Sequence, residues 1–370
     1  SRLRATRSGV VNILFVMKTR GDAGSTHAVA NYAQVAPRHG HTVAIYGTPI
    51  SYVSDLPLTV DIDDFDRVVY LFESELYRIK PMRQAAMLTR FPRKSRLIVD
   101  TDGMYSPLIH LDAYDFNHRS EAERESWIGY VDTLGDSVAQ TVMPPSRNPR
   151  VTALPFFGYN PQLRLEASAA PPKRYDILHV GHNWWRWRQV STELLPAIEQ
   201  IRDQLGDIGF VGLWWDQPPP EGPAAGPEEA FQSDPDVLRR LRIETPKAVM
   251  YHDVIKTMSS ARINIFTQRP LLRHLRHLTL KYFEIFCADT IPLLMLDRDH
   301  VEAVYGPAAR ELVLSGNVAA KLLDALRRPD DYRAVVDEVR RHLIAHHAYD
   351  RLVEDLVAAL RSEPGSGAAP

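Results

Sequence analysis

Two arginines follow a short apolar run in the segment GHNWWRWR. Arg186 and Arg188 come after Tyr175–Val180, a run with the length and composition of a buried strand. A guanidinium group binds phosphate oxygens in a bidentate manner and stays charged at any working pH. The segment therefore indicates a diphosphate site at the end of a strand. The alternative is that the arginines are solvated while the neighbouring tryptophans pack an interface.

One carboxylate, Glu284, lies early in a predicted helix within KYFEIFCADTIPLL. A carboxylate accepts hydrogen bonds from vicinal hydroxyls such as those of a ribose, so Glu284 is a ligand candidate and not a proton donor. It could also be a surface acid stabilised by the helix dipole. The loop before this helix, RPLLRHLRH, is basic and either contacts phosphate or is solvated. It contains Arg269, Arg273, His274 and Arg276.

A glycine-bearing loop, Lys18–Thr26, follows the first apolar run. Gly21 and Gly24 relieve steric limits there, and the next helix offers unpaired N–H groups to an anion. The loop is neither a GxGxxG fingerprint nor a GxxxxGK[ST] loop, which disfavours a dehydrogenase and a P-loop NTPase. An ordinary turn with Ser25 or Thr26 as the N-cap is the alternative.

The segment DTDG supplies the candidate general bases. Asp102 is the first choice and Asp100 the second, because both follow a predicted strand and should face a cleft. An ordinary Asp-Gly turn explains the same residues. His27 and His110 are alternatives, although a lone histidine is more often structural.

Metal binding has little support. The chain has a single cysteine, Cys287, and the pair His346-His347 has no spaced partner. The DxD-like pair in DTDG could hold magnesium only by analogy with a different fold. The sequence therefore predicts no metal site.

Buried parallel strands that alternate with helices would position these residues. Apolar runs alternate with amphipathic stretches in both halves, which is typical of two open α/β sheets. Strands are expected at Val11–Met17, Thr42–Tyr46, Arg67–Phe72, Arg96–Val99, Thr141–Met143, Val151–Leu154, Tyr175–Val180, Ile208–Leu213, Arg262–Phe266 and Ile291–Leu296. Helices are expected at Thr26–Arg38, Glu75–Thr89, Ser120–Gln140, Ser191–Leu205, Val254–Ala261, Leu278–Ala288, Val318–Arg327 and Tyr332–Leu360.

The chain divides most naturally between its two α/β halves. Periodicity disappears near three prolines, so residues 1–157 form an N-terminal Rossmann-like domain, 158–173 a linker and 174–331 a second Rossmann-like domain. Helix 332–360 could pack back on the first domain, and residues 362–370 form a disordered tail. Gln217–Pro235 reads as an insertion loop. Ligands of such sheets bind at the carboxyl ends of the strands.

Composition agrees with an average globular protein. The 370 residues exceed one ordinary core, while 45% hydrophobic residues, 24% charged residues and a net charge of -2 show no disordered character. Nothing in the charge demands a polyanionic partner. No apolar run is long enough to span a membrane, and Ser1–Gly9 looks like a ragged leader without a cleavage site. The single cysteine cannot form an internal disulfide, so the cytoplasm is expected.

Several segments together resemble GT-B glycosyltransferases, in particular the GT4-like and CgeB-like group. KYFEIFCADTIPLL resembles their [KR]xxExxACGxPxL stretch, VGHNWWRWRQV their diphosphate loop, and LPFFGYNP the P-x-G-x-[DN] element that ends their first domain. The resemblance implies a UDP-, GDP- or dTDP-sugar donor, with Glu284 on the ribose and the base on Thr245–Tyr251. Together with the glycine loop and the basic loop described above, the predicted donor-binding residues are Gly21, Gly24, Arg186, Arg188, Tyr251, Arg269, Thr279, Leu280, Lys281 and Glu284.

Two positions depart from the family pattern. His277 stands where retaining members often carry a second glutamate that contacts the donor sugar, and Asp289 replaces the usual glycine. A histidine can still bond a sugar hydroxyl, so His277 joins the candidate catalytic residues, but donor identity and stereochemical outcome stay open.

The resemblance implies a glycosyltransferase of hexosyltransferase type. The absence of a metal-ligand cluster, with arginines and helix N-termini able to neutralise the diphosphate, predicts that it is metal-independent. It would move the sugar to a hydroxyl or amine of a small-molecule acceptor bound by the first domain, with no nucleic-acid partner and no other cofactor. The alternatives are a non-catalytic sugar- or nucleotide-binding relative and a GT-B-shaped nucleotide-sugar epimerase or phosphorylase-like catalyst.

Overall fold

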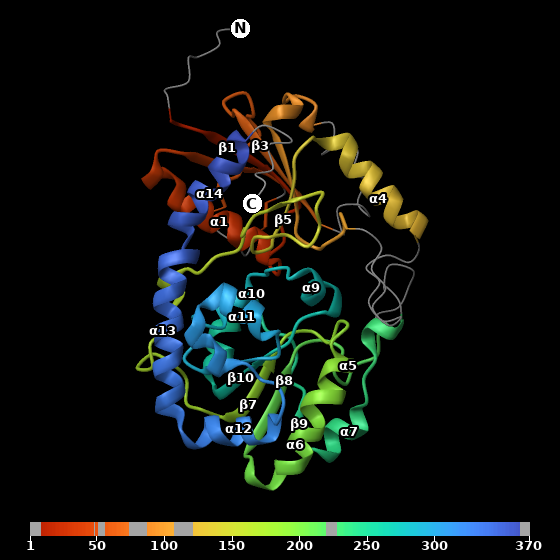
Figure 1. Cartoon of the computed structure of the whole chain (residues 1–370), viewed down its shortest axis with the longest axis vertical. Helices are drawn as coiled ribbons and strands as arrows, with labels where there is room; N and C mark the ends of the chain where they lie inside the picture. The colour runs from red at the N-terminus through yellow and green to blue at the C-terminus, as the bar shows by residue number, and fades with distance from the viewer. Residues whose placement is uncertain are drawn as a thin grey trace.

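The computed structural model describes residues 9–47, 49–50, 56–73, 87–106, 121–219 and 228–362. Figure 1 shows two α/β halves stacked along the long axis, each built around a parallel sheet. This arrangement confirms the predicted fold class of two doubly wound α/β units that face each other.

The first sheet has the strand order β2-β1-β3-β4-β5-β6. Its strands are β1 (Asn12–Val16), β2 (Thr42–Tyr46), β3 (Arg67–Phe72), β4 (Arg96–Asp100), β5 (Val138–Gln140) and β6 (Thr152–Ala153). In β1, Ile13 and Phe15 join one hydrophobic cluster while Leu14 and Val16 join another, and all four are buried. Successive side chains point to opposite faces, so both faces of this strand must be covered.

The second sheet has the order β11-β10-β7-β8-β9. Its strands are β7 (Tyr175–Val180), β8 (Asp207–Val211), β9 (Ile243–Glu244), β10 (Ala261–Phe266) and β11 (Ile291–Leu294). The chain runs from β7 outward to β9 and then returns to the other side of β7 with β10. The order therefore reverses between β7 and β10, and such a switch point opens a crevice at the carboxyl ends of the strands.

Helices and short turns connect these strands. The helices are α1 (Gly24–Val35), α4 (Glu121–Leu134), α5 (Trp187–Gln189), α6 (Leu195–Ile201), α7 (Pro235–Arg240), α8 (Val254–Ser259), α9 (Pro270–Leu275), α10 (Lys281–Glu284), α11 (Arg298–Tyr305), α12 (Val318–Arg327), α13 (Pro329–His347) and α14 (Tyr349–Arg361). A π-helical turn, Val190–Leu194, joins α5 to α6. None of the helices that the structure describes has the length and apolar character needed to cross a membrane.

The expected C-terminal helix Tyr332–Leu360 is two helices, α13 and α14. Ala348 between them is extended, with φ -69° and ψ 149°. The N–H of Tyr159, in the segment between β6 and β7, donates to the carbonyl of His347 at 2.8 Å. This carbonyl would accept from the next helical turn if the helix continued, so the distant segment satisfies it at the break. Beyond the break α14 packs on α1, where Tyr349 contacts Tyr32 edge-on at 5.2 Å. In Figure 1, α13 runs beside the second half and α14 beside the first.

Element boundaries shift elsewhere. The helix predicted to reach Gln140 ends at Leu134, and the strand expected at Thr141–Met143 is β5, Val138–Gln140. Gly135 and the bend after it separate the two elements, which amphipathic periodicity does not reveal. Between β6, which ends at Ala153, and β7 lies the segment predicted as the linker.

Some predictions fall outside the described residues. They concern residues 1–8 of the leader, 75–86 of an expected helix, His110, 220–227 of the insertion loop and 363–370 of the tail.

Candidate functional site

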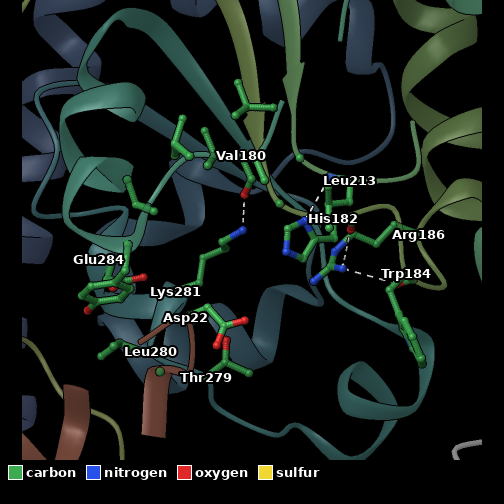
Figure 2. Close-up of a pocket in the computed structure, with 18 of the residues that line it drawn as sticks. Asp22, Val180, His182, Trp184, Arg186, Leu213, Thr279, Leu280, Lys281 and Glu284 are labelled. Atoms are coloured by element: carbon green, nitrogen blue, oxygen red, sulfur yellow. Dashed lines mark hydrogen bonds between the residues drawn. The ribbon is translucent and has the colours of Figure 1, made fainter. Parts of the chain in front are cut away.

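A cavity of about 560 Å³ opens where the carboxyl ends of the second sheet face the first half. Its volume lies within the ordinary range for small-molecule sites. Figure 2 shows side chains from both halves directed into it. The lining residues that the argument below uses are Arg20, Asp22, Gly24, His182, Trp184, Arg186, Ala248, Val249, Tyr251, Arg269, Thr279, Leu280, Lys281 and Glu284.

Two cations occupy the centre of this cavity. Lys281, at the start of α10, points its ammonium at the carbonyl of Val180 at the end of β7 (Figure 2). Arg186 donates to the carbonyl of His182 at 2.8 Å, which fixes the loop after β7 around its guanidinium. Burial, together with the charge of Arg186, lowers the pKa of Lys281 to about 7. Burial and Arg269 lower the pKa of Arg186 to about 10, so this arginine stays protonated at neutral pH.

The predicted ribose ligand is tied to the first half of the chain. Glu284 is 7% exposed, and burial raises its pKa while a hydrogen bond from Tyr251 and the charge of Lys281 oppose that shift. The ring of Tyr251 stacks on His27 of α1, with centroids 3.3 Å apart and planes 5° apart. His27 in turn donates from Nε2 to the carbonyl of Gly21 at 2.8 Å. The carboxylate is thus linked through one aromatic stack to the glycine loop.

The sequence interpretation assigned no role to His182 and Asp22, which both line the cavity. The N–H of Leu213 donates to Nδ1 of His182 at 3.0 Å, which leaves the proton of the neutral ring on Nε2. Desolvation by the surrounding protein, together with the charges of Lys281 and Arg186, lowers the pKa of His182 to about 4, so the ring is neutral at pH 7. His182 follows β7 and Asp22 follows β1, so both lie in loops at the carboxyl ends of strands. Ligands of such sheets bind at these ends, and this rule could have pointed to both residues.

Asp100 lies outside the cavity lining and is fully buried. Its carboxylate accepts hydrogen bonds from the N–H groups of Asp102, Met104 and Tyr105 at 3.1, 3.0 and 2.8 Å, and from Nε2 of Gln140 at 2.8 Å. Burial raises its pKa to about 6 although these donors favour the ionised form. Asp100 therefore organises the loop after β4.

Asp102 and His277 meet at the contact between the two halves. Asp102 pairs with Arg269 at 3.6 Å, and Arg269 reaches the cavity while Asp102 does not line it. His277 is fully buried, with Nδ1 3.2 Å from the hydroxyl oxygen of Thr141. Burial lowers the pKa of His277 to about 4 against the opposing charge of Asp102. The structure brings these residues together beside the cavity and not inside it.

The other predicted site residues divide between the cavity and its surroundings. Gly24, Tyr251, Arg269, Thr279 and Leu280 line it, whereas Gly21 and Arg188 do not. A β-carbon at Gly24 would lie 3.0 Å from Cβ of Leu280, so this position explains why the loop contains glycine. Arg188 is exposed, one residue into α5.

The pair His346-His347 at the end of α13 has a third histidine, His342, beside it. The rings of His342 and His346 lie 4.4 Å apart, and both line a second cavity of about 580 Å³ with His347. Within the described ranges, no group of three or more histidine, cysteine, aspartate or glutamate residues has an arrangement suited to a metal ion.

The chain is similar to known glycosyltransferases in part of its sequence and in its fold. A family model described as glycosyl transferase-like matches residues 191–358. Sucrose-phosphate synthase from Thermosynechococcus elongatus is 14% identical with a TM-score of 0.63, over 95% of this chain and 98% of that one. T4 phage BGT bound to UDP-glucose is 12% identical with a TM-score of 0.57, over 95% of this chain and 100% of that one. No curated protein sequence matched the chain.

The chain has the GT-B fold. Two parallel α/β sheets with a cavity between them match these glycosyltransferase structures over nearly their whole length. The GT-B relationship predicted from the segment KYFEIFCADTIPLL is thus supported at the level of fold and of the glycosyl transferase-like match.

One prediction about partners is wrong. The sequence predicts no nucleic-acid partner, yet proteins with this GT-B fold include a DNA-modifying β-glucosyltransferase and an α-glucosyltransferase solved with UDP and a 13-mer DNA. The latter is 10% identical with a TM-score of 0.61, over 95% of this chain and 99% of that one. A net charge near zero sums over the whole surface, whereas local basic clusters decide contact with a polyanion.

Proposed function

We propose that this protein transfers a glycosyl group from a nucleoside-diphosphate sugar to a hydroxyl or amine acceptor. One observation carries the proposal: Arg186, Lys281 and Glu284 share one cavity at the carboxyl ends of the second sheet. The glycosyl transferase-like match over residues 191–358 supports it. Within this class, the ordered segments of the sequence favour the GT4-like and CgeB-like group.

Each part of the donor has a matching surface in the cavity. Lys281 and Arg186 offer positive charge to the diphosphate, and Nε2–H of His182 adds a neutral donor. When the donor binds, Glu284 accepts hydrogen bonds from the ribose hydroxyls, which replace the hydrogen bond that it receives from the Tyr251 hydroxyl. Ala248 and Val249 give the base an apolar wall.

The same cations support catalysis without a metal ion. Arg20, Arg186, Arg269 and Lys281 line the cavity, and positive side chains stabilise a leaving diphosphate as a metal does. A structural neighbour, T4 phage BGT, has been solved with UDP and Mn²⁺, so adding this ion to the present protein tests metal dependence. We expect nucleoside diphosphate release to persist in excess EDTA and to change less than about threefold on adding Mn²⁺.

Calorimetric titration with UDP, GDP and dTDP tests the proposal. We expect one of the three to bind and to raise the unfolding temperature, because a ligand that binds only the folded state stabilises it. Absence of binding by all three contradicts the proposal. Conversion of the donor sugar to an epimer without transfer to an acceptor would instead show an epimerase.

Glu284→Gln is expected to reduce the preference for whichever nucleoside diphosphate binds over inorganic pyrophosphate about tenfold, close to 1.4 kcal/mol. The amide keeps the shape of the carboxylate but offers one acceptor oxygen to the ribose. Comparing the two ligands cancels the change in charge near Lys281. Isothermal titration measures both affinities, and Glu199→Gln, a surface change outside the cavity, is the control. An unchanged ratio would show that Glu284 does not bind the ribose.

A further inference from the structure

The second cavity lies at the junction of α13 and α14 and shares no lining residue with the donor cavity. Its volume of about 580 Å³ is close to that of the donor cavity. The first half supplies β6 and the segment after β5, the second half supplies α11 and α13, and α14 completes the wall. In Figure 1 the junction of α13 and α14 lies at the level where the two halves meet. A cavity of this size between separate elements fits a small molecule.

His347 is the most buried of the histidines that line this cavity, with 3% of its surface exposed. Its ring bonds to the backbone of Val304, and among the described residues none bonds to Nδ1, so the bond to Val304 uses Nε2. Burial, with the rings of His342 and His346, lowers the pKa of His347 to about 4. Nδ1 therefore carries a lone pair at pH 7. A ligand that donates an O–H or N–H would satisfy this buried acceptor.

Within the described lining, the other polar groups bring donors and acceptors but little net charge. Burial lowers the pKa of His342, so its ring is also neutral at pH 7. A neutral imidazole donates from one nitrogen and accepts at the other. Nε of Arg351 lies 3.3 Å from the carboxylate of Asp355, so the two charges on this wall compensate each other. A neutral ligand therefore fits these walls better than an ion does.

Apolar side chains form the rest of the wall that matters for a ligand. Leu154 and Pro155 line the cavity from the first half, and Leu352 and Ala359 line it from α14. A sugar ring matches this combination, because it has an apolar face of C–H groups and a rim of hydroxyls that both donate and accept. A purely apolar molecule would leave the imidazole nitrogens without partners.

We propose that this cavity is a binding site for a neutral saccharide. One sugar hydroxyl donates to Nδ1 of His347, while others bond to His342 and to the pair Arg351–Asp355. The face of the ring packs on Leu154 and Leu352. Because the walls come from both halves, a bound saccharide bridges the halves and should raise the unfolding temperature.

Titration of free sugars tests the site directly. Glucose, maltose, sucrose and trehalose are the neutral probes, and we expect at least one to bind with a dissociation constant of about 1 mM or lower in calorimetry. Ala303→Phe places a ring in the cavity from an exposed position of α11 and should weaken this binding at least about 20-fold. His347→Phe keeps a ring but removes Nδ1, and should weaken binding about tenfold. Ala345→Phe, at an exposed position of α13 outside the lining, is the matched control and should change the affinity less than about twofold.

Charged analogues test the chemical class. Glucosamine and glucuronate keep the ring but add a positive or a negative charge, and both should bind more weakly than glucose. Circular dichroism shows whether each variant is folded, and Ala359→Leu replaces Ala303→Phe if the latter is not.

Three results would overturn the saccharide site. They are absence of binding by all four neutral sugars, binding that is unchanged by Ala303→Phe or His347→Phe, and tighter binding of glucosamine or glucuronate than of glucose. None of these titrations uses a nucleotide. A chain that binds a sugar here but no nucleoside diphosphate would therefore contradict the proposed function alone, and the reverse result would contradict the saccharide site alone.

Discussion

Lys281→Met is expected to weaken binding of the nucleoside diphosphate about 100-fold, roughly 3 kcal/mol. The ammonium of Lys281 lies in the centre of the donor cavity beside Arg186, and methionine preserves much of the apolar stem without the charge. A charge-assisted bond to phosphate in a partly buried site is worth more than one at the surface. Titration of UDP, GDP and dTDP measures the loss. Lys94→Met, which removes an exposed lysine of the first half, should leave the affinity unchanged.

The same lysine predicts how binding depends on pH. Its pKa is lowered to about 7 in the free protein, and a bound diphosphate favours the protonated form. Below pH 7 the ammonium is already present, so the affinity should be nearly level there. Above pH 7 binding must take up a proton, so the dissociation constant should rise by up to about tenfold per pH unit. Lys281→Met should lack this dependence between pH 7 and 9.

A diphosphate affinity that is unaffected by Lys281→Met would place the diphosphate elsewhere. An equal rise of the dissociation constant with pH in both proteins would assign the titration to another group. Both measurements use the folded protein without an acceptor, so they do not depend on which acceptor is natural.

Asp100→Asn is expected to lower the free energy of unfolding by about 2–4 kcal/mol. The carboxylate accepts from three backbone N–H groups and from Gln140, all within 3.1 Å. An asparagine offers one oxygen, and its amide N–H groups would point at other donors in a buried site. Urea unfolding followed by circular dichroism measures the change. Asp102→Asn, at the more exposed neighbour, should cost less than about 1 kcal/mol.

This pair of variants also tests the roles predicted for the two aspartates. If Asp100→Asn has the stability of the wild type and yet loses turnover, Asp100 acts in catalysis and not in holding the loop. Diphosphate binding in the folded variant should match the wild type, because Asp100 lies outside the cavity lining.

The local sequence determined the fold. The run VNILFVM is largely apolar at consecutive positions, which is typical of a strand covered on both faces, and β1 is such a strand. The same logic placed β7 and the loop after it, and with them Arg186 at the cavity. Glu284 and Lys281 also followed from sequence, because the resemblance in KYFEIFCADTIPLL spans both residues and a short stretch of chain positions them together.

The tertiary structure decided which side chains share the cavity. Asp22 faces Lys281 only because the glycine loop of one half packs against Leu280 of the other, a contact between residues more than 250 positions apart. Asp100 and Asp102 look alike in DTDG, yet one is buried under four donors and the other is paired with Arg269. The break at Ala348 also depends on Tyr159, from a distant segment. Hydrophobic patterning specifies which face of an element is buried, whereas the partners of a polar side chain depend on how separate elements pack.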